Sequence, residues 1–164
     1  MKKSLVVLFA LSFIPVTVPA ANVPVAPNGI ALYQDFRGWQ AIAPSYREDQ
    51  NVIKVVLGNQ IAVKAMRDKI LPLPDGTILA KVIWTTKKHP EFPVATVPDT
   101  FSQVEFMVKD AAKYKTTGGW GYARFVGNDY KPYGKDASFA QECVGCHMPV
   151  KENDYLFTGF AAVP

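Results

Sequence analysis

Five residues near the C-terminal end restrict what this chain can build more than any other stretch: Cys143-Val-Gly-Cys146-His147. Cysteines three positions apart lie on one face of a helix, and C-x-x-C-H is the pattern that attaches a c-type haem. Each thiol can bond one vinyl group of the haem, and the histidine that follows can bind the iron as its axial ligand. The motif therefore predicts haem c on Cys143 and Cys146, with His147 as the ligand of the iron.

Two other uses of the cysteine pair remain open. A structural disulfide suits an oxidising compartment, but so short a loop is more often a redox pair than a structural cross-link. A zinc site needs about four ligands. The chain has two cysteines and two histidines, and His89 lies in a distant proline-rich segment. Haem attachment is favoured over both alternatives.

The first twenty residues have the order of a secretory signal peptide. Lys2 and Lys3 precede an apolar run over residues 5–14, and small residues lead to Ala20. The apolar run is too short to span a bilayer. We therefore expect cleavage after Ala20, a single haem domain over residues 21–164 and a periplasmic location. A retained membrane anchor is the alternative.

Charge and hydropathy limit the partners of the remaining chain. The formal net charge of +4 falls by two with the lysines of the signal, and so small a surplus does not indicate binding to nucleic acid. No further segment is long and apolar enough for a membrane span, so none is expected after signal removal.

The body of the sequence is strand-rich. Runs of β-branched and aromatic residues bounded by turn residues predict strands over residues 39–43, 52–57, 77–85, 103–109 and 120–126. A proline-rich loop is expected over residues 87–100. The predicted fold class is α+β, mainly antiparallel β-sheet with a few helices, and the c-type haem is attached near the C-terminus.

Two helices are expected beside these strands. Asn59 is a candidate N-cap for a helix over residues 60–69, whose apolar residues fall mostly on one side. The last helix is expected to begin near Asp136 or Ser138, because Ser138 and Gln141 have the spacing of a capping box. That last helix would carry both cysteines.

Lys81 is an unusual residue for the strand expected over residues 77–85. Alternation places Leu79, Lys81 and Ile83 on one face, so a charged side chain interrupts an apolar surface. A buried ammonium tends to lose its proton or find a partner, and a neutral amine is a nucleophile. The alternative is a strand-edge lysine whose ammonium reaches solvent on its flexible stem.

The function of a c-type haem depends on the second axial position of the iron. Met148 follows His147 too closely to reach the opposite face, and His89 lies in an expected surface loop. Met66 and Met107 lie in apolar patterns that are typical of core residues. An open position, which permits ligand binding or chemistry, is therefore favoured over a simple electron carrier.

In these features the sequence resembles the cytochrome P-460 family and the related β-sheet cytochromes c′-beta. The segments that carry the resemblance are residues 36–39, 75–77 with Lys81, 108–110, 118–120, the haem motif and residues 153–158. The resemblance implies a homodimer with a five-coordinate haem. It also places Lys81 where cytochromes P-460 carry a lysine that is covalently joined to the haem macrocycle.

The resemblance implies an oxidoreductase that oxidises hydroxylamine or nitric oxide and passes electrons to a periplasmic redox partner. Hydroxylamine-oxidising members use a distal carboxylate as proton acceptor, but the matching position here is Ser138. Asp136 is the nearest candidate for that role, although an Asp there is as readily a helix cap. Glu105 and Glu142 cannot be placed relative to the iron from the sequence.

Two functions compete with the oxidoreductase. The cytochrome c′-beta branch lacks the lysine cross-link and binds nitric oxide or carbon monoxide in an apolar pocket without turnover. A simple electron carrier would need a strong sixth ligand. Candidates for a distal wall, each more often an ordinary core residue, are Trp84, Phe101, Phe106 and Met107.

Overall fold

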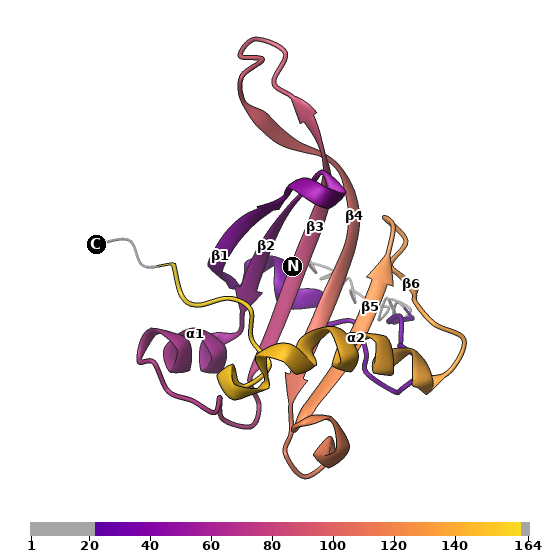
Figure 1. Cartoon of the computed structure of the whole chain (residues 1–164). Coiled ribbons are helices and arrows are strands. Elements are labelled where there is room, and N and C mark those ends of the chain that lie inside the picture. Colours follow the sequence, from indigo (N-terminus) through magenta and orange to yellow (C-terminus); the bar gives the residue numbers. More distant parts are fainter. Residues whose placement is uncertain (1–21, 162–164) are drawn as a thin grey trace, which may run out of the picture.

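The computed structural model describes residues 22–161, so the expected signal peptide, residues 1–20, lies outside the described part of the chain. A six-stranded antiparallel sheet forms the body, and each strand pairs with the next one along the chain (Figure 1). Its strands are β1 (Gln40–Arg47), β2 (Val52–Gly58), β3 (Ile78–Lys88), β4 (Thr96–Lys109), β5 (Trp120–Val126) and β6 (Lys131–Pro132). The predicted α+β class, mainly antiparallel sheet, is confirmed.

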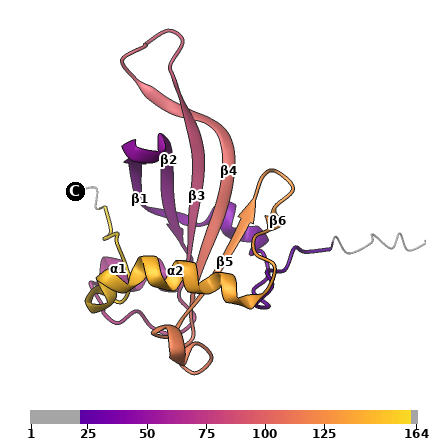
Figure 2. The ribbon, with the colours of Figure 1, turned by 45° about the vertical axis from the view of Figure 1, so that its right-hand side comes forward.

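Two α-helices lie against one face of the sheet, near the end at which β3 begins (Figures 1 and 2). They are α1 (Gln60–Arg67) and α2 (Ala140–His147). Shorter 3-10 helices are η1 (Gln34–Gly38), η2 (Glu48–Gln50), η3 (Lys115–Thr117), η4 (Ala137–Phe139) and η5 (Met148–Asn153). Among residues 22–161, neither helix type provides a segment long and apolar enough to cross a bilayer.

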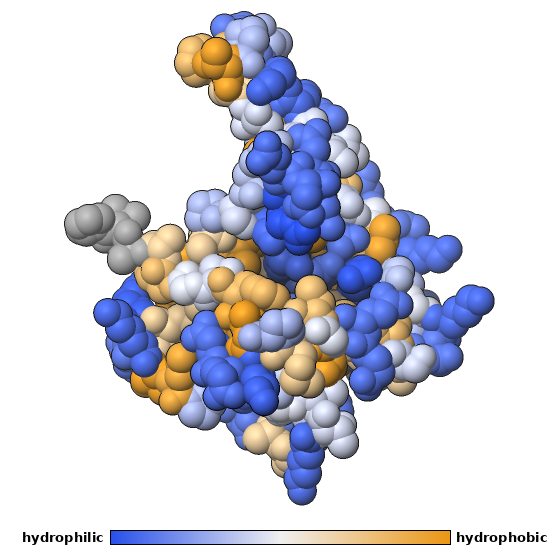
Figure 3. All heavy atoms as spheres, in the orientation of Figure 1, coloured by the Kyte–Doolittle hydropathy of each residue, from blue (hydrophilic) through white to orange (hydrophobic). Residues whose placement is uncertain are grey.

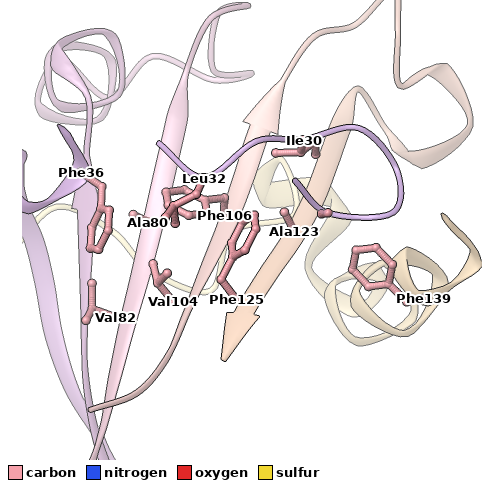
Figure 4. Close-up of a cluster of buried hydrophobic side chains, with 11 residues drawn as sticks. Ile30, Leu32, Phe36, Ala80, Val82, Val104, Phe106, Ala123, Phe125 and Phe139 are labelled. Atoms are coloured by element: carbon pink, nitrogen blue, oxygen red, sulfur yellow. The ribbon is translucent and has the colours of Figure 1, made fainter. Parts of the chain in front are cut away.

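Alternation along the strands divides the buried side chains into two clusters, one on each face of the sheet. The helix-side cluster includes Leu79 and Tyr122 from the sheet and Val144 from α2. The opposite cluster includes Phe106 and is covered by the N-terminal segment, which crosses the strands (Figure 4). Both faces of the sheet are thus covered.

The ends of both predicted helices need a partial correction. Asn59 is confirmed as the N-cap of α1, because its Oδ1 accepts a hydrogen bond from the Ala62 N–H at 2.9 Å, but α1 ends at Arg67. The capping box at Ser138 is wrong. The Asp136 carboxylate accepts from the Ser138 N–H at 2.9 Å, and a carboxylate also suits the positive end of a helix.

The loop expected over residues 87–100 is largely a β-ribbon. Strand β3 continues to Lys88 and pairs with Thr96, where β4 begins. Pro98 is tolerated because this two-stranded ribbon has open edges where its missing N–H costs no ladder hydrogen bond. The hairpin projects from the body (Figure 2) and has apolar side chains at its tip (Figure 3), where Phe92 and Val94 are exposed.

Candidate haem site

A cavity of about 640 Å³ lies between the sheet and α2. Its wall includes Cys143, Cys146 and His147 from α2, together with Phe157 from the segment that follows, and Lys81 from β3. A cavity of this size is typical of sites for cofactors and small molecules. The fold therefore brings the haem motif and the unusual lysine to the same cavity.

The register of the sheet arranges its cavity wall in three rows of directly paired residues. Because side chains on one face recur every second residue, successive rows lie about 7 Å apart. Beginning at α2, they are the lower row (Leu79, Met107 and Tyr122), the middle row (Val56, Lys81, Glu105 and Arg124) and the upper row (Lys54, Ile83 and Gln103). The lower row is apolar apart from the Tyr122 hydroxyl, whereas the middle row carries three charges.

His147 is held in one orientation at the level of the lower row. Its Nδ1 lies 2.6 Å from the carbonyl oxygen of Tyr155, and a carbonyl can only accept, so Nδ1 carries the proton and Nε2 is left to bind a metal. The imidazole ring lies between the rings of Tyr122 and Phe157, at centroid distances of 5.5 and 5.0 Å. Burial lowers the pKa of His147 below its usual 6.5, which favours the neutral form that ligates metals.

Both cysteines of the motif have free thiols, Cys143 half-buried and Cys146 exposed. Burial raises the pKa of the Cys143 thiol, so this residue is a neutral thiol at neutral pH. Within residues 22–161, no three side chains of His, Cys, Asp or Glu lie close enough together to hold a metal ion. A zinc site of the usual four ligands therefore has no support in this region.

Glu105 is the centre of a polar network in the middle row. Its carboxylate pairs with the Lys81 ammonium, accepts from Arg124 Nε at 3.0 Å and accepts from Gln103 Nε2 at 2.5 Å. Burial raises the pKa of the Glu105 carboxyl, but the charges of Lys81 and Arg124 outweigh burial and hold the pKa below its usual 4.5. Glu105 is thus an ionised carboxylate in the cavity wall.

Lys81 was expected either to be buried with a partner or to extend its ammonium into solvent, and the structure supports the partner, Glu105. The side chains of Lys81 and Glu105 are 30% and 20% exposed, so the lysine does not reach far into solvent. The position of Glu105 relative to the haem motif could not be predicted from the sequence, because its contact with Lys81 depends on the pairing of β3 with β4. The local signal for it is weak: a charged residue two positions after the polar Gln103.

Asp136 is not among the residues that line the cavity. Its side chain is exposed, and its hydrogen bonds to Ser138 lower the pKa of the carboxyl. The geometry therefore supports a capping role for Asp136 and gives no support to proton acceptance. Glu142 does line the cavity and accepts a hydrogen bond of 3.3 Å from the Tyr133 hydroxyl.

The expected distal wall is wrong for Trp84 and Phe101, which do not line the cavity. Their side chains pack against the opposite cluster, because their positions in the alternation point them away from α2. The Phe106 side chain belongs to the opposite cluster too, although the residue forms part of the cavity wall. Met107 faces the cavity, but it belongs to the lower row beside His147. The row beyond the middle row consists of Lys54, Ile83 and Gln103 instead.

Of the candidates for a sixth ligand, His89 lies outside the cavity, and the two methionines lie in its wall. His89 lies at the start of the hairpin tip, where its Nδ1 accepts from the Glu91 N–H at 3.2 Å, and it does not line the cavity. Met66 and Met107 do line it, but both belong to the helix-side cluster near α2. The open coordination position stays a prediction.

The donor set fits a covalently bound haem. Two thiols on one helix and an imidazole with a free Nε2 face one cavity, and the imidazole has the backbone hydrogen bond typical of a metal-ligating histidine. The Tyr122 hydroxyl, beside His147, is buried without a hydrogen-bond partner in the described structure. An additional polar group in the cavity would be able to satisfy it.

Comparison with protein families identifies the family of the chain. The family model Cytochrome P460 matches residues 33–158, a range that contains the six strands, both α-helices and the cavity wall. Among curated proteins, no significant match to the chain is found. The chain therefore belongs to the cytochrome P460 family, a family of haem cytochromes.

Proposed function

We propose that this chain is a periplasmic c-type cytochrome that oxidises hydroxylamine or nitric oxide. Cys143 and Cys146 would bond the haem, and His147 would bind its iron. The observation that carries the proposal is the charged middle row, in which Glu105 and Lys81 face the cavity that the haem motif lines. A polar wall of this kind is unsuited to a purely apolar gas-binding pocket.

When bound, the haem supplies a redox-active iron that takes electrons from a small nitrogen compound and passes them to a soluble periplasmic redox partner. Oxidation of hydroxylamine releases protons with the electrons, so a base is needed beside the substrate. Glu105 meets this need better than Asp136, because it is ionised and lines the cavity.

We further assign Lys81 as the amine that bonds the haem macrocycle. That bond would replace one ring C–H and one N–H, a two-electron oxidation for which we propose hydrogen peroxide as the oxidant, reduced to two molecules of water. Lys81 must first give up its proton, and the adjoining Glu105 carboxylate is an acceptor within ion-pair contact. The bonded nitrogen no longer carries the ammonium charge.

Loss of that charge changes Glu105. Burial raises its pKa, and the Lys81 charge is the largest contribution that lowers it. With the Lys81 charge removed and Arg124 remaining, the pKa of Glu105 rises, so the carboxylate becomes a stronger base. Bonding of Lys81 therefore prepares Glu105 to accept protons from the substrate.

The homodimer expected from the resemblance stays a prediction.

The test compares the wild type with Lys81→Ala and with Lys64→Ala, which replaces an exposed lysine on α1. Intact mass and the optical spectrum of the ferrous protein are recorded. We expect wild type and Lys64→Ala to share a third covalent link to the haem and a red-shifted ferrous absorption. Both signs disappear in Lys81→Ala, while the two cysteines still hold the haem.

Identical spectra and masses for wild type and Lys81→Ala would refute the lysine bond. Hydroxylamine oxidation is then measured with a soluble electron acceptor. A protein that binds nitric oxide or carbon monoxide but does not oxidise hydroxylamine or nitric oxide would contradict the enzymatic proposal and select the gas-binding alternative. A low-spin, six-coordinate ferrous spectrum would contradict the open iron position.

A further inference from the structure

We propose that the buried ion pair between Lys109 and Asp154 is a positioning device for the proximal ligand. It fixes the backbone carbonyl of Tyr155 against His147 and thereby sets how strongly the imidazole donates to a metal. The inference rests on ligation by His147, which is part of the proposed function, and does not depend on the substrate.

The ion pair is sealed from solvent. Lys109 Nζ lies 2.5 Å from Asp154 Oδ1, and the two side chains are 7% and 6% exposed. The same carboxylate accepts from Trp120 Nε1 at 3.2 Å and from the Leu73 N–H at 2.8 Å. Asp154 is therefore anchored to β4, to β5 and to the segment that follows α1.

Stability alone is a weak reason for such a pair. Two charges lose their hydration on burial, and apolar residues of similar volume often serve a fold as well or better. The position of Asp154, directly before Tyr155, suggests another role. Whatever fixes Asp154 also restricts where the next peptide group can lie.

The backbone here has a conformation that needs outside support. Asp154 and Tyr155 have φ values of 51° and 64°, which are uncommon for residues other than glycine and persist where surrounding contacts impose them. This reversal follows η5 and directs the Tyr155 carbonyl to His147 Nδ1, at 2.6 Å.

The Tyr155 side chain is held by the same lysine. Its ring lies so close to Gly118 that a Cβ at that position would be 2.1 Å from the Tyr155 Cε2. Lys109 Nζ donates to the Gly118 carbonyl at 3.3 Å, while its ion pair holds Asp154. Lys109 thus fixes both the residue before Tyr155 and the surface on which the Tyr155 ring packs.

The consequence for a bound metal follows from the hydrogen bond. A firm acceptor on Nδ1–H raises the basicity of Nε2, and the oxidised metal gains more from a basic ligand than the reduced metal does. Loosening the carbonyl weakens this donation. The reduction potential then rises, and a tenfold change in the relative affinity for the two oxidation states corresponds to about 59 mV.

The experiment uses the haem-loaded protein with Asp154→Asn, which keeps the shape of the side chain but removes its charge. The control is Phe125→Leu, a core substitution in the opposite cluster that lowers stability without touching the proximal side. Reduction potential and the iron–histidine stretching frequency of the ferrous protein are measured. We expect a higher potential and a lower stretching frequency in Asp154→Asn, and wild-type values in the control.

Unchanged potential and stretching frequency in Asp154→Asn would overturn the inference. If that variant does not accumulate as folded haem protein, Lys109→Met is measured instead and the same shifts are required of it. Absence of any iron–histidine band in the wild type would refute ligation by His147 and with it the proposed function. A wild-type band with unshifted variants would refute the positioning role alone.

Discussion

Replacing Lys109 with methionine should destabilise the protein by a large and calculable amount. The substitution keeps most of the stem of the lysine but leaves the Asp154 carboxylate buried, with hydrogen bonds from Trp120 and Leu73 and no cation. Breaking a buried pair by removing one partner costs about 3–5 kcal/mol. We expect this loss in the free energy of unfolding of Lys109→Met.

The double variant Lys109→Met/Asp154→Asn separates charge from packing. With both charges removed, the side-chain amide introduced in place of the Asp154 carboxylate can still accept from Trp120 or Leu73, so most of the lost stability should return. The difference between the double variant and the sum of the single variants gives the coupling energy. A coupling of about 2 kcal/mol or more is expected for a sealed pair.

Guanidinium unfolding followed by far-ultraviolet circular dichroism provides the assay. With a denaturant slope of about 4 kcal/mol/M, the Lys109→Met midpoint should fall by about 1 M. Lys64→Met, which removes a surface pair with Asp68, should leave the midpoint almost unchanged. A Lys109→Met midpoint equal to that of Lys64→Met would refute the argument from burial.

Three further substitutions test other contacts, and a fourth, Asp136→Asn, serves as a control. Gly118→Ala should lower the unfolding midpoint and haem yield, because its Cβ would overlap the Tyr155 ring and its φ is +69°; wild-type stability would contradict the close contact. Asn59→Ala should cost about 1 kcal/mol in unfolding free energy, and no loss would contradict its role as a cap. While Lys81 carries its charge, the pKa of Glu105 is lowered in the folded state, so before haem is bonded its stabilising contribution is complete above pH 4.5 and disappears as the pH falls through the folded value. Glu105→Gln should therefore lose less stability on acidification than wild type, and should lower hydroxylamine turnover about 100-fold, while Asp136→Asn keeps wild-type turnover.

The strands that the sequence predicted best are those whose local pattern and tertiary pairing agree. The run over residues 120–126 coincides with β5, because it is apolar and is bounded by glycines. The ribbon formed by the ends of β3 and β4 was missed, because residues 96–100 contain a proline and have little apolar pattern. These residues form a strand because they pair with β3 across the hairpin. Such pairing cannot be predicted from the local sequence pattern.

The residues of the candidate site also differ in whether they depend on the local sequence or on distant segments. The placement of Cys143, Cys146 and His147 on one helix could be predicted, because it depends on spacing within a short segment. Glu105 and Asp154 could not, because each acquires its role from a lysine on a distant segment of the chain. A charged residue on an apolar strand face is the one local sign of such pairs, and Lys81 showed it.

Lys81 and Lys109 show why burial decides what an ion pair can do. Both are strand residues on the helix side of the sheet, and both pair with a carboxylate from another segment. The Lys109 pair is closed to solvent, and the Asp154 carboxylate already accepts hydrogen bonds from Lys109, Trp120 and Leu73. The pair can therefore affect the site only through the backbone that it fixes. The Lys81 pair lies in the cavity wall, partly exposed, and Glu105 keeps Arg124 as a second cation. Loss of the Lys81 charge would therefore leave Glu105 paired with Arg124. Loss of the Lys109 charge would leave the buried Asp154 carboxylate without a cation.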